Sequence, residues 1–207
     1  MGRQENLGSS SPTREAWGRS QFKQILLFLR NFIRDPAMVG WLMPSSRFLV
    51  GDIIKRIDWD RAKVIVEYGA GTGTFTKAIL QHMRPDARLI ALEINPDFYQ
   101  FLSSSFQDPR LHISQESAAD IDTVLADLGY SRADCVVSGI PFKSLPHGLR
   151  DSIVRKTHAV LRPRGKFLVY QVSGTVLPYL ESVFGHVSRD FQLLNIIPAR
   201  LFYCARA

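Results

Sequence analysis

The sequence predicts an α/β fold built on one mainly parallel sheet of seven strands with helices on both faces. From Lys63 onward, short apolar runs alternate with longer segments of helical periodicity. This alternation is typical of βαβ units, whose parallel strands are buried on both faces. The last two strand-like runs closely flank Pro198, which indicates a short connection and therefore an antiparallel edge strand. The 207 residues suffice for one such domain with an N-terminal extension.

Each element is predicted in turn from its periodicity and its flanking residues. Runs of β-branched, aliphatic or aromatic residues are expected to form strands, at Val64–Tyr68, 89–93, Leu111–Ser114, 134–138, 166–172, 191–197 and 201–204. Segments with helical spacing are expected at 21–34, from Ser45 or Ser46 to about 54, and at Thr74–His82, 96–106, 119–128, 149–161 and 176–184. Either serine is a plausible helix cap. The residues Arg162-Pro163-Arg164-Gly165 are expected to form a turn.

The chain divides into three parts. Residues 1–20 are rich in Gly, Ser, Arg and Glu and are expected to form a disordered tail. Residues 21–60 are expected to form N-terminal helices, and 21–34 combines an apolar face with basic residues. This pattern suits a helix that binds a membrane surface and covers the active site, although an ordinary helix packed on the domain has the same pattern. Residues 61–207 are expected to form the cofactor-binding catalytic domain.

Composition limits the partners and the compartment. The formal charge of +7 favours an anionic partner, either nucleic acid or an acidic membrane surface. Cys135 and Cys204 lie far apart in apolar segments, so we expect buried free thiols and a reducing compartment. The early chain has no apolar run near the roughly 20 residues of a membrane-spanning helix, and no secretory signal is recognised. We therefore expect a cytoplasmic protein.

A glycine-rich turn follows the first predicted strand. Glu67 and Tyr68 lead into Gly69, Gly71 and Gly73, placed at alternate positions just before a helix. Glycine permits positive φ and a close approach of the backbone to a ligand. Dinucleotide folds usually carry G-x-G-x-x-G, whereas the tighter G-x-G-x-G is typical of S-adenosylmethionine sites.

Two further acidic positions support a cofactor site. Glu93, followed by Ile94, ends the second predicted strand, where a carboxylate can accept hydrogen bonds from both ribose hydroxyls. Glu116, Ser117 and Ala118 follow the third strand, where a side-chain acceptor and a backbone N–H could contact the adenine edge. The same glycines could instead form only a tight turn, with Glu93 as a helix cap, but their joint occurrence favours S-adenosylmethionine.

With these motifs the chain resembles the class I methyltransferases over roughly residues 60–207, which implies their Rossmann-like sheet. More narrowly, the segments 137–142 and 195–199 resemble the bacterial phospholipid N-methyltransferase family, and the segment 28–47 resembles the membrane-binding leader of that family. This resemblance implies methyl transfer to the amino head group of phosphatidylethanolamine or its methylated forms, toward phosphatidylcholine, or of ornithine lipid. It also implies a peripheral enzyme on the inner face of the cytoplasmic membrane, with an anionic membrane surface and the lipid substrate as partners.

Two other functions stay open. The loop after the fourth strand is related to the Asn-(Ile/Leu)-Pro-(Tyr/Phe) motif of adenine methyltransferases, but Ser138 and Gly139 stand at its expected start. An rRNA adenine dimethyltransferase is thus an alternative, disfavoured because no helical RNA-binding domain is recognised after the catalytic domain. A noncatalytic cofactor-binding or membrane-binding protein is a third possibility. The five histidines lack a shared ligand spacing, so we expect no metal.

The substrate residues are expected in the loop after the fourth strand. We expect Ser138 and the main-chain carbonyls of Gly139, Ile140 and Pro141 to orient the amine, and Phe142 to form one wall that contacts the methylated cation. Lys143 is a candidate for the lipid phosphate. Because the sulfonium methyl is already activated, alignment and desolvation of a neutral amine can supply much of the rate.

Overall fold

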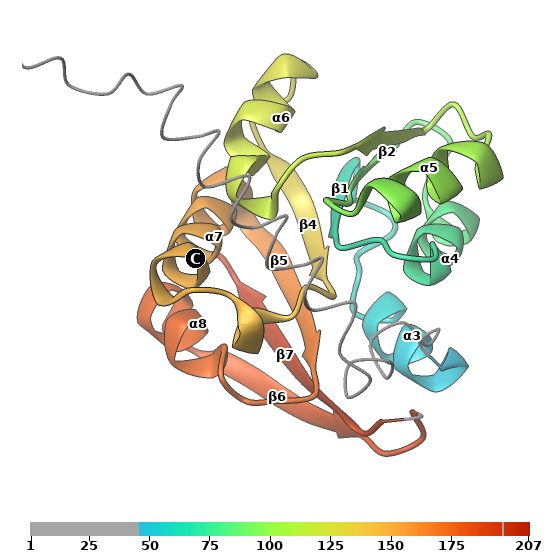
Figure 1. Cartoon of the computed structure of the whole chain (residues 1–207). Coiled ribbons are helices and arrows are strands. Elements are labelled where there is room, and N and C mark those ends of the chain that lie inside the picture. The colour runs from blue at the N-terminus through green and yellow to red at the C-terminus, as the bar shows by residue number, and fades with distance from the viewer. Residues whose placement is uncertain (1–45, 196) are drawn as a thin grey trace, which may run out of the picture.

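The computed structural model describes residues 46–195 and 197–207, and Figure 1 shows a twisted sheet with helices on both faces. The strands are β1 (Val64–Tyr68), β2 (Arg88–Leu92), β3 (Leu111–Ser114), β4 (Ala133–Ser138), β5 (Leu161–Gln171), β6 (Val187–Gln192) and β7 (Ala199–Ala205). The α-helices are α3 (Arg47–Ile54), α4 (Thr74–His82), α5 (Pro96–Ser105), α6 (Ile121–Asp127), α7 (His147–Val160) and α8 (Leu177–Phe184), and the 3₁₀ helices are η2 (Ala118–Asp120) and η3 (Phe142–Ser144).

The sheet has the order β3-β2-β1-β4-β5-β7-β6. Strands β1 to β5 pair in parallel, while β7 pairs antiparallel with both β5 and β6. The predicted α/β fold with its mainly parallel, seven-stranded sheet is therefore confirmed. The strand order reverses between β1 and β4, and in open α/β sheets ligands bind beyond the carboxyl ends of the strands at such a point.

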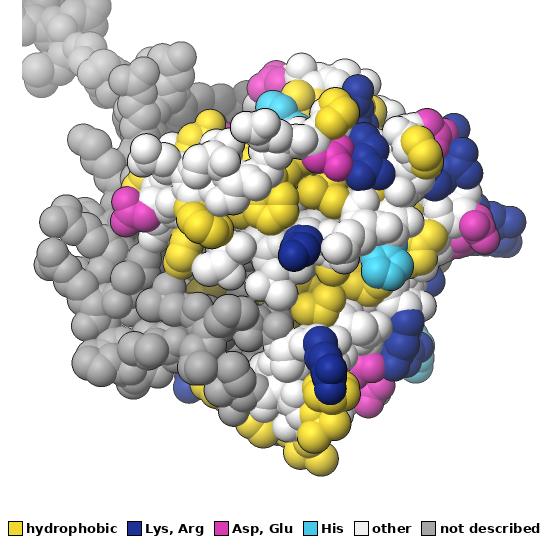
Figure 2. All heavy atoms as spheres, turned by 90° about the vertical axis from the view of Figure 1, so that its right-hand side faces the viewer, with side chains coloured by type: hydrophobic (Ala, Val, Ile, Leu, Met, Phe, Trp, Pro, Cys, Tyr) yellow, Lys and Arg dark blue, Asp and Glu magenta, His cyan; other side chains and the backbone are white. Residues whose placement is uncertain are grey.

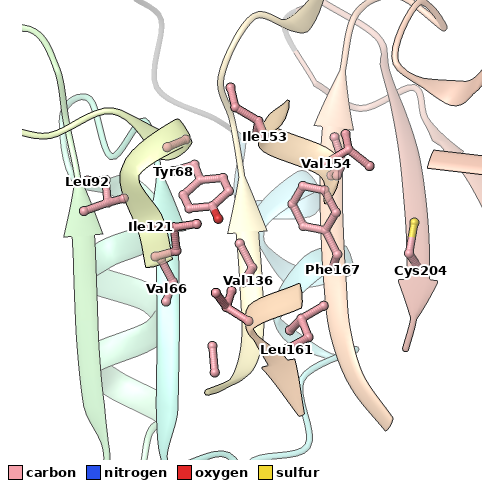
Figure 3. Packing of buried hydrophobic residues seen from close by; sticks show 14 of the residues in the cluster. Val66, Tyr68, Leu92, Ile121, Val136, Ile153, Val154, Leu161, Phe167 and Cys204 are labelled. Atoms are coloured by element: carbon pink, nitrogen blue, oxygen red, sulfur yellow. The ribbon is translucent and has the colours of Figure 1, made fainter. Parts of the chain in front are cut away.

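Both faces of the sheet are covered, as the apolar runs predicted. Along β1, Val66 belongs to the core cluster under α6 and α7, whereas Ile65 belongs to the cluster under α3 and α4. Figure 3 shows the first of these clusters, in which the rings of Tyr68 and Phe167 lie edge to face at 6.2 Å. The central strands are thus fixed from both sides, and their carboxyl ends are held in place for the loops that follow.

Three details differ from the sequence-based expectation. The sixth strand is Val187–Gln192 and not 191–197, because the strand at the edge of the sheet is largely polar and exposed while the apolar Leu193 and Leu194 lie beyond it. The expected turn at 162–165 lies inside β5, where the register with β4 shifts and Arg164 has a φ of 63°. The helix expected from 119 begins as the 3₁₀ helix η2.

The described part of the chain begins with the capped helix α3. Ser46 caps α3, with its Oγ accepting a hydrogen bond from the Leu49 N–H at 3.2 Å, as expected for one of the two serines. The expected tail 1–20 and the helix 21–34 lie outside the described residues. The N–H of Ser46 donates to Asn195 Oδ1 at 2.8 Å, which places the start of α3 beside the β6–β7 connection.

Candidate active site

The turn between β1 and α4 needs its three glycines. Gly69, Gly71 and Gly73 have φ values of 71°, 54° and 78°, in the left-handed region that disfavours other residues. Gly69 also brings two loops together, because a Cβ there would lie 2.9 Å from Cγ2 of Ile140 in the loop after β4. The predicted glycine turn therefore forms at the point where the strand order reverses, with its main chain available to a ligand.

Glu93 lies directly beside this turn. One carboxylate oxygen accepts from the Gly71 N–H at 2.8 Å, and the other accepts from the Asn95 N–H at 2.8 Å. The residue is 6% exposed, and burial raises the pKa of its carboxyl group against the opposing effect of these hydrogen bonds. The sequence placed Glu93 at the end of β2, and the structure brings it within hydrogen-bond distance of the glycines.

Glu67 is a second buried carboxyl group, on β1 just before the turn. Its Oε2 accepts a hydrogen bond from Thr76 Oγ1 of α4 at 2.7 Å. Burial raises the pKa of Glu67 to about 7; the Thr76 hydrogen bond opposes this shift, and the nearby Glu93 carboxylate adds to it. At neutral pH the turn is therefore lined by two carboxyl groups that resist being charged together.

The side chain of Tyr68, a predicted cofactor residue, is engaged in the core, while a contact of its main chain with the cofactor stays a prediction. Its side chain is fully buried, and its hydroxyl lies 3.0 Å from Thr157 Oγ1 of α7. Its main-chain carbonyl accepts from the Gly139 N–H at 2.9 Å. Tyr68 therefore joins β1 to α7 and to the loop after β4, and it does not present its side chain to a ligand.

The remaining predicted cofactor residues lie at the ends of β2 and β3. Ile94 is half-buried directly after Glu93. Ser117 is buried, and its Oγ accepts from the Ala119 N–H at 3.1 Å, which caps η2 at Ala118. Glu116 is exposed, and partial burial together with the carboxylates of Asp120 and Asp127 raises its pKa. Their contact with adenine stays a prediction.

The loop after β4 is held from behind. Gln171 is 2% exposed, and its Nε2 donates to the carbonyl oxygens of Ile140 at 2.7 Å and Tyr170 at 2.8 Å. The Ile140 carbonyl also accepts from the Phe142 N–H at 2.9 Å, and the Pro141 carbonyl accepts from the Ser144 N–H at 2.9 Å. The Ile140 carbonyl therefore already accepts two hydrogen bonds inside the structure, while the Pro141 carbonyl accepts one and its contact with the amine stays a prediction.

Ser138 and Gly139 begin this loop at the end of β4. Ser138 is fully buried, and its Oγ has no hydrogen-bond partner within the described part of the chain. Gly139 cannot carry a side chain, since a Cβ would overlap the hydroxyl of Tyr170. The Tyr170 ring stacks on Phe75 of α4, with ring centroids 4.6 Å apart. A buried hydroxyl without a partner at the strand end is a group that a ligand can satisfy.

Phe142 does not lie as expected for a contact with substrate, whereas the contact of Lys143 with the lipid phosphate stays a prediction. Phe142 is 0% exposed and belongs to the main core cluster, so its ring anchors the loop and does not form an open wall. Lys143 is exposed, while its carbonyl accepts from Nη2 of the buried Arg150 at 2.7 Å. Arg150 also donates through Nε to the Leu145 carbonyl at 2.7 Å, so this arginine fixes the loop.

The comparisons with known proteins agree with this geometry. Residues 65–165 match the family model described as a methyltransferase domain. The chain is 33% identical over 184 residues to an ornithine lipid N-methyltransferase from Singulisphaera acidiphila, which covers 88% of this chain and 96% of that protein. The chain belongs to the class I methyltransferases. These enzymes use S-adenosylmethionine as the methyl donor.

Other similarities are more limited. A ribosomal RNA small subunit methyltransferase H from Methylorubrum populi is 31% identical over 99 residues, or 47% of this chain and 28% of that protein. Among solved structures, the N-methyltransferase NodS from Bradyrhizobium japonicum with bound S-adenosyl-L-homocysteine has a TM-score of 0.63 at 13% identity, covering 77% of this chain and 86% of that one. At 13% identity, the similarity to NodS supports the fold alone.

The residues of this methyltransferase fit its cofactor. The glycine turn has main chain at positive φ, with Gly69 and Gly71 half-buried, and Glu93 offers a buried carboxylate whose two oxygens already accept hydrogen bonds. Within 46–195 and 197–207, no group of three or more His, Cys, Asp or Glu residues is placed to hold a metal ion. No helix in those ranges is long and apolar enough to cross a membrane.

Proposed function

We propose that this methyltransferase transfers methyl groups from S-adenosylmethionine to the amino head group of a membrane lipid, with ornithine lipid as the first candidate. The observation that carries the proposal is the similarity to an ornithine lipid N-methyltransferase along almost the whole length of both chains. Phosphatidylethanolamine and its methylated forms are the other head groups to test, in which case the product lies on the route to phosphatidylcholine.

The glycine turn and two acidic residues are proposed to hold the cofactor. Gly69, Gly71 and Gly73 would face it with main chain, while Glu93 would accept hydrogen bonds from its ribose hydroxyls. Glu116, Ser117 and Ala118 would contact the adenine edge from the end of β3. When bound, S-adenosylmethionine supplies a methyl group activated by its positively charged sulfur.

The loop after β4 is proposed to position the amine. Ser138 Oγ is buried and without a partner in the described chain, so an amine N–H can donate to it at the edge of the glycine turn. Gln171 and Arg150 keep this loop in one conformation, and a fixed geometry lowers the cost of aligning the amine with the methyl group. An ammonium head group must lose a proton first, because it has no lone pair.

We further propose that the enzyme works peripherally at the inner face of the cytoplasmic membrane. A formal charge of +7 favours anionic lipid surfaces. The segment 21–34, whose apolar and basic residues suit an interfacial helix, is proposed to contribute to this binding.

The deciding experiment measures transfer of labelled methyl groups to ornithine-lipid liposomes, phosphatidylethanolamine liposomes and undermethylated ribosomal RNA. We expect label in at least one lipid, and the labelled lipid identifies the head group. Label in RNA alone would overturn the lipid proposal and favour an RNA methyltransferase, the class to which part of this chain is also similar. Ser138→Ala is expected to lower turnover, and an unchanged rate and substrate affinity would remove Ser138 from the proposed role.

A further inference from the structure

Exposed hydrophobic side chains gather around the β6–β7 connection at the carboxyl edge of the sheet. Leu193 and Leu194 are 67% and 63% exposed, beyond the end of β6. We call these two residues together with Phe48, Val172 and Phe191 the apolar rim; the last three are 42%, 45% and 49% exposed. In Figure 1 the β6–β7 connection projects beside α3, and Figure 2 shows hydrophobic side chains gathered at the lower end of that side of the molecule.

A hydrogen bond and strand pairing connect the parts of this rim. Asn195, next to Leu194, accepts from the Ser46 N–H at 2.8 Å, which brings the start of α3 and Phe48 to the connection. On the other side, Phe191 and Arg200 are register partners of β6 and β7. Arg200 is also the register partner of Gln171, directly before Val172. The rim is therefore one edge and not a set of scattered residues.

Arginines accompany the apolar side chains on both sides of the rim. The Arg47 guanidinium lies 4.9 Å from the ring centroid of Phe48, and that of Arg200 lies 5.8 Å from the ring centroid of Phe191. Within the described residues, neither arginine forms an ion pair. The neighbouring acids are engaged, since Asp52 pairs with Lys55 and Asp190 lies 3.8 Å from Arg56.

We propose that the apolar rim inserts into the surface of an anionic bilayer. Leucine and phenylalanine side chains bury apolar area among acyl chains, while unpaired arginines meet lipid phosphates at head-group depth. Gln171 donates to the Ile140 carbonyl in the loop after β4, and it is the register partner of Arg200 on β7. The rim therefore adjoins the active site. The inference rests on the proposed lipid substrate. It identifies the apolar rim as the surface that brings the active site to the lipid.

The test follows the environment of residue 194 in the full-length protein. Cys135 and Cys204 are both 2% exposed, so Leu194→Cys gives one accessible thiol for an environment-sensitive fluorophore. Phe101→Cys on α5 is the matched control, because Phe101 is 49% exposed away from the rim. With vesicles of phosphatidylcholine and phosphatidylglycerol, we expect a blue shift at 194 and none at 101. No shift at 194, or equal shifts at both positions, would overturn the proposal.

A charge variant provides the second readout. Leu193→Asp with Leu194→Asp is expected to weaken vesicle binding at least about tenfold, while Phe101→Asp leaves it unchanged. Unchanged vesicle binding of the double variant would overturn the proposal. The same holds if binding is unchanged and light scattering shows that the two substitutions disrupt a dimer. These vesicles contain no methyl-accepting amine, so failure of lipid methylation and failure of rim insertion are separate results.

Discussion

Glu93, which we propose to bind the ribose hydroxyls, is held in position by hydrogen bonds within the protein. Its two oxygens are held by the Gly71 and Asn95 N–H groups at 2.8 Å each, so the carboxylate is oriented in advance. Hydrogen bonds to a charged group contribute about 1.5–3 kcal/mol, which corresponds to roughly 10- to 100-fold in affinity.

Glu93→Gln is therefore expected to raise the Kd for S-adenosylmethionine by about 10- to 100-fold, because the amide has one acceptor fewer and no charge. Isothermal titration calorimetry measures this change. Glu181→Gln is the control, since Glu181 lies on α8 and pairs with Arg189. Equal affinities for the wild type and the Glu93 variant would exclude Glu93 from ribose binding.

Glu67 makes stability depend on pH. Its folded pKa of about 7 lies above the ordinary value of 4.5, so the folded state holds this proton more tightly than the unfolded state. The associated stability is fully present below about pH 4.5 and is lost as the pH rises through about 7. A shift of this size corresponds to about 3 kcal/mol.

Glu67→Gln removes the titrating group while keeping an acceptor for Thr76. From pH 5 to pH 8, the free energy of unfolding of the variant relative to that of the wild type is expected to rise by up to about 3 kcal/mol. Urea unfolding at both pH values measures the difference. A difference in free energy of unfolding that is the same at pH 5 and pH 8 would contradict the raised pKa.

At the scale of elements, the end of β5 controls the loop after β4. Gln171 supplies the donor that holds the Ile140 carbonyl at 2.7 Å, and Tyr170 occupies the space beside Gly139. Small displacements of aligned groups cost large factors in rate. We therefore propose that Gln171 is a positioning residue, which acts on the amine through the loop.

Gln171→Leu is expected to lower kcat for lipid methylation by about 10- to 100-fold with an unchanged Kd for S-adenosylmethionine. The lost hydrogen bonds should also lower the free energy of unfolding by about 1–3 kcal/mol. Steady-state kinetics, calorimetry and urea unfolding separate these effects, with Gln81→Leu at an exposed position of α4 as the control. A structural role alone would lower stability and leave kcat unchanged.

At the scale of the whole molecule, the fold and the geometry of the candidate cofactor site were predictable for different reasons. The central strands are buried on both faces, so they appear in the sequence as apolar runs. The glycine turn lies within one short segment, and Glu93 directly follows the next strand. The edge strand β6 was misplaced because its residues are mostly exposed.

The substrate side was less predictable because its parts come from distant segments. Gln171 contacts Ile140 across 31 positions, and a motif within one loop cannot reveal such a pair. Phe142 was expected to form one wall of the site, but its side chain packs in the core. Arg150 is buried and donates to two carbonyls of the loop, and no sequence motif indicated this role.

The charge of the whole molecule leads to a further prediction about membrane binding. The chain carries a formal charge of +7, and Arg47 and Arg200 of the described residues flank the apolar rim. Each basic residue near an anionic surface contributes about 1 kcal/mol. Salt reduces this attraction, since the Debye length falls from about 10 Å at 0.1 M to about 3 Å at 1 M.

Binding to vesicles of phosphatidylcholine and phosphatidylglycerol is therefore expected to weaken at least about tenfold over this range of salt. Sedimentation of the full-length protein with vesicles measures the bound fraction, and vesicles of phosphatidylcholine alone are the control. Residual binding at high salt should depend on Leu193 and Leu194, because salt does not screen the burial of apolar area. Binding that is strong and equally insensitive to salt on both kinds of vesicle would show that charge does not direct this enzyme to the membrane.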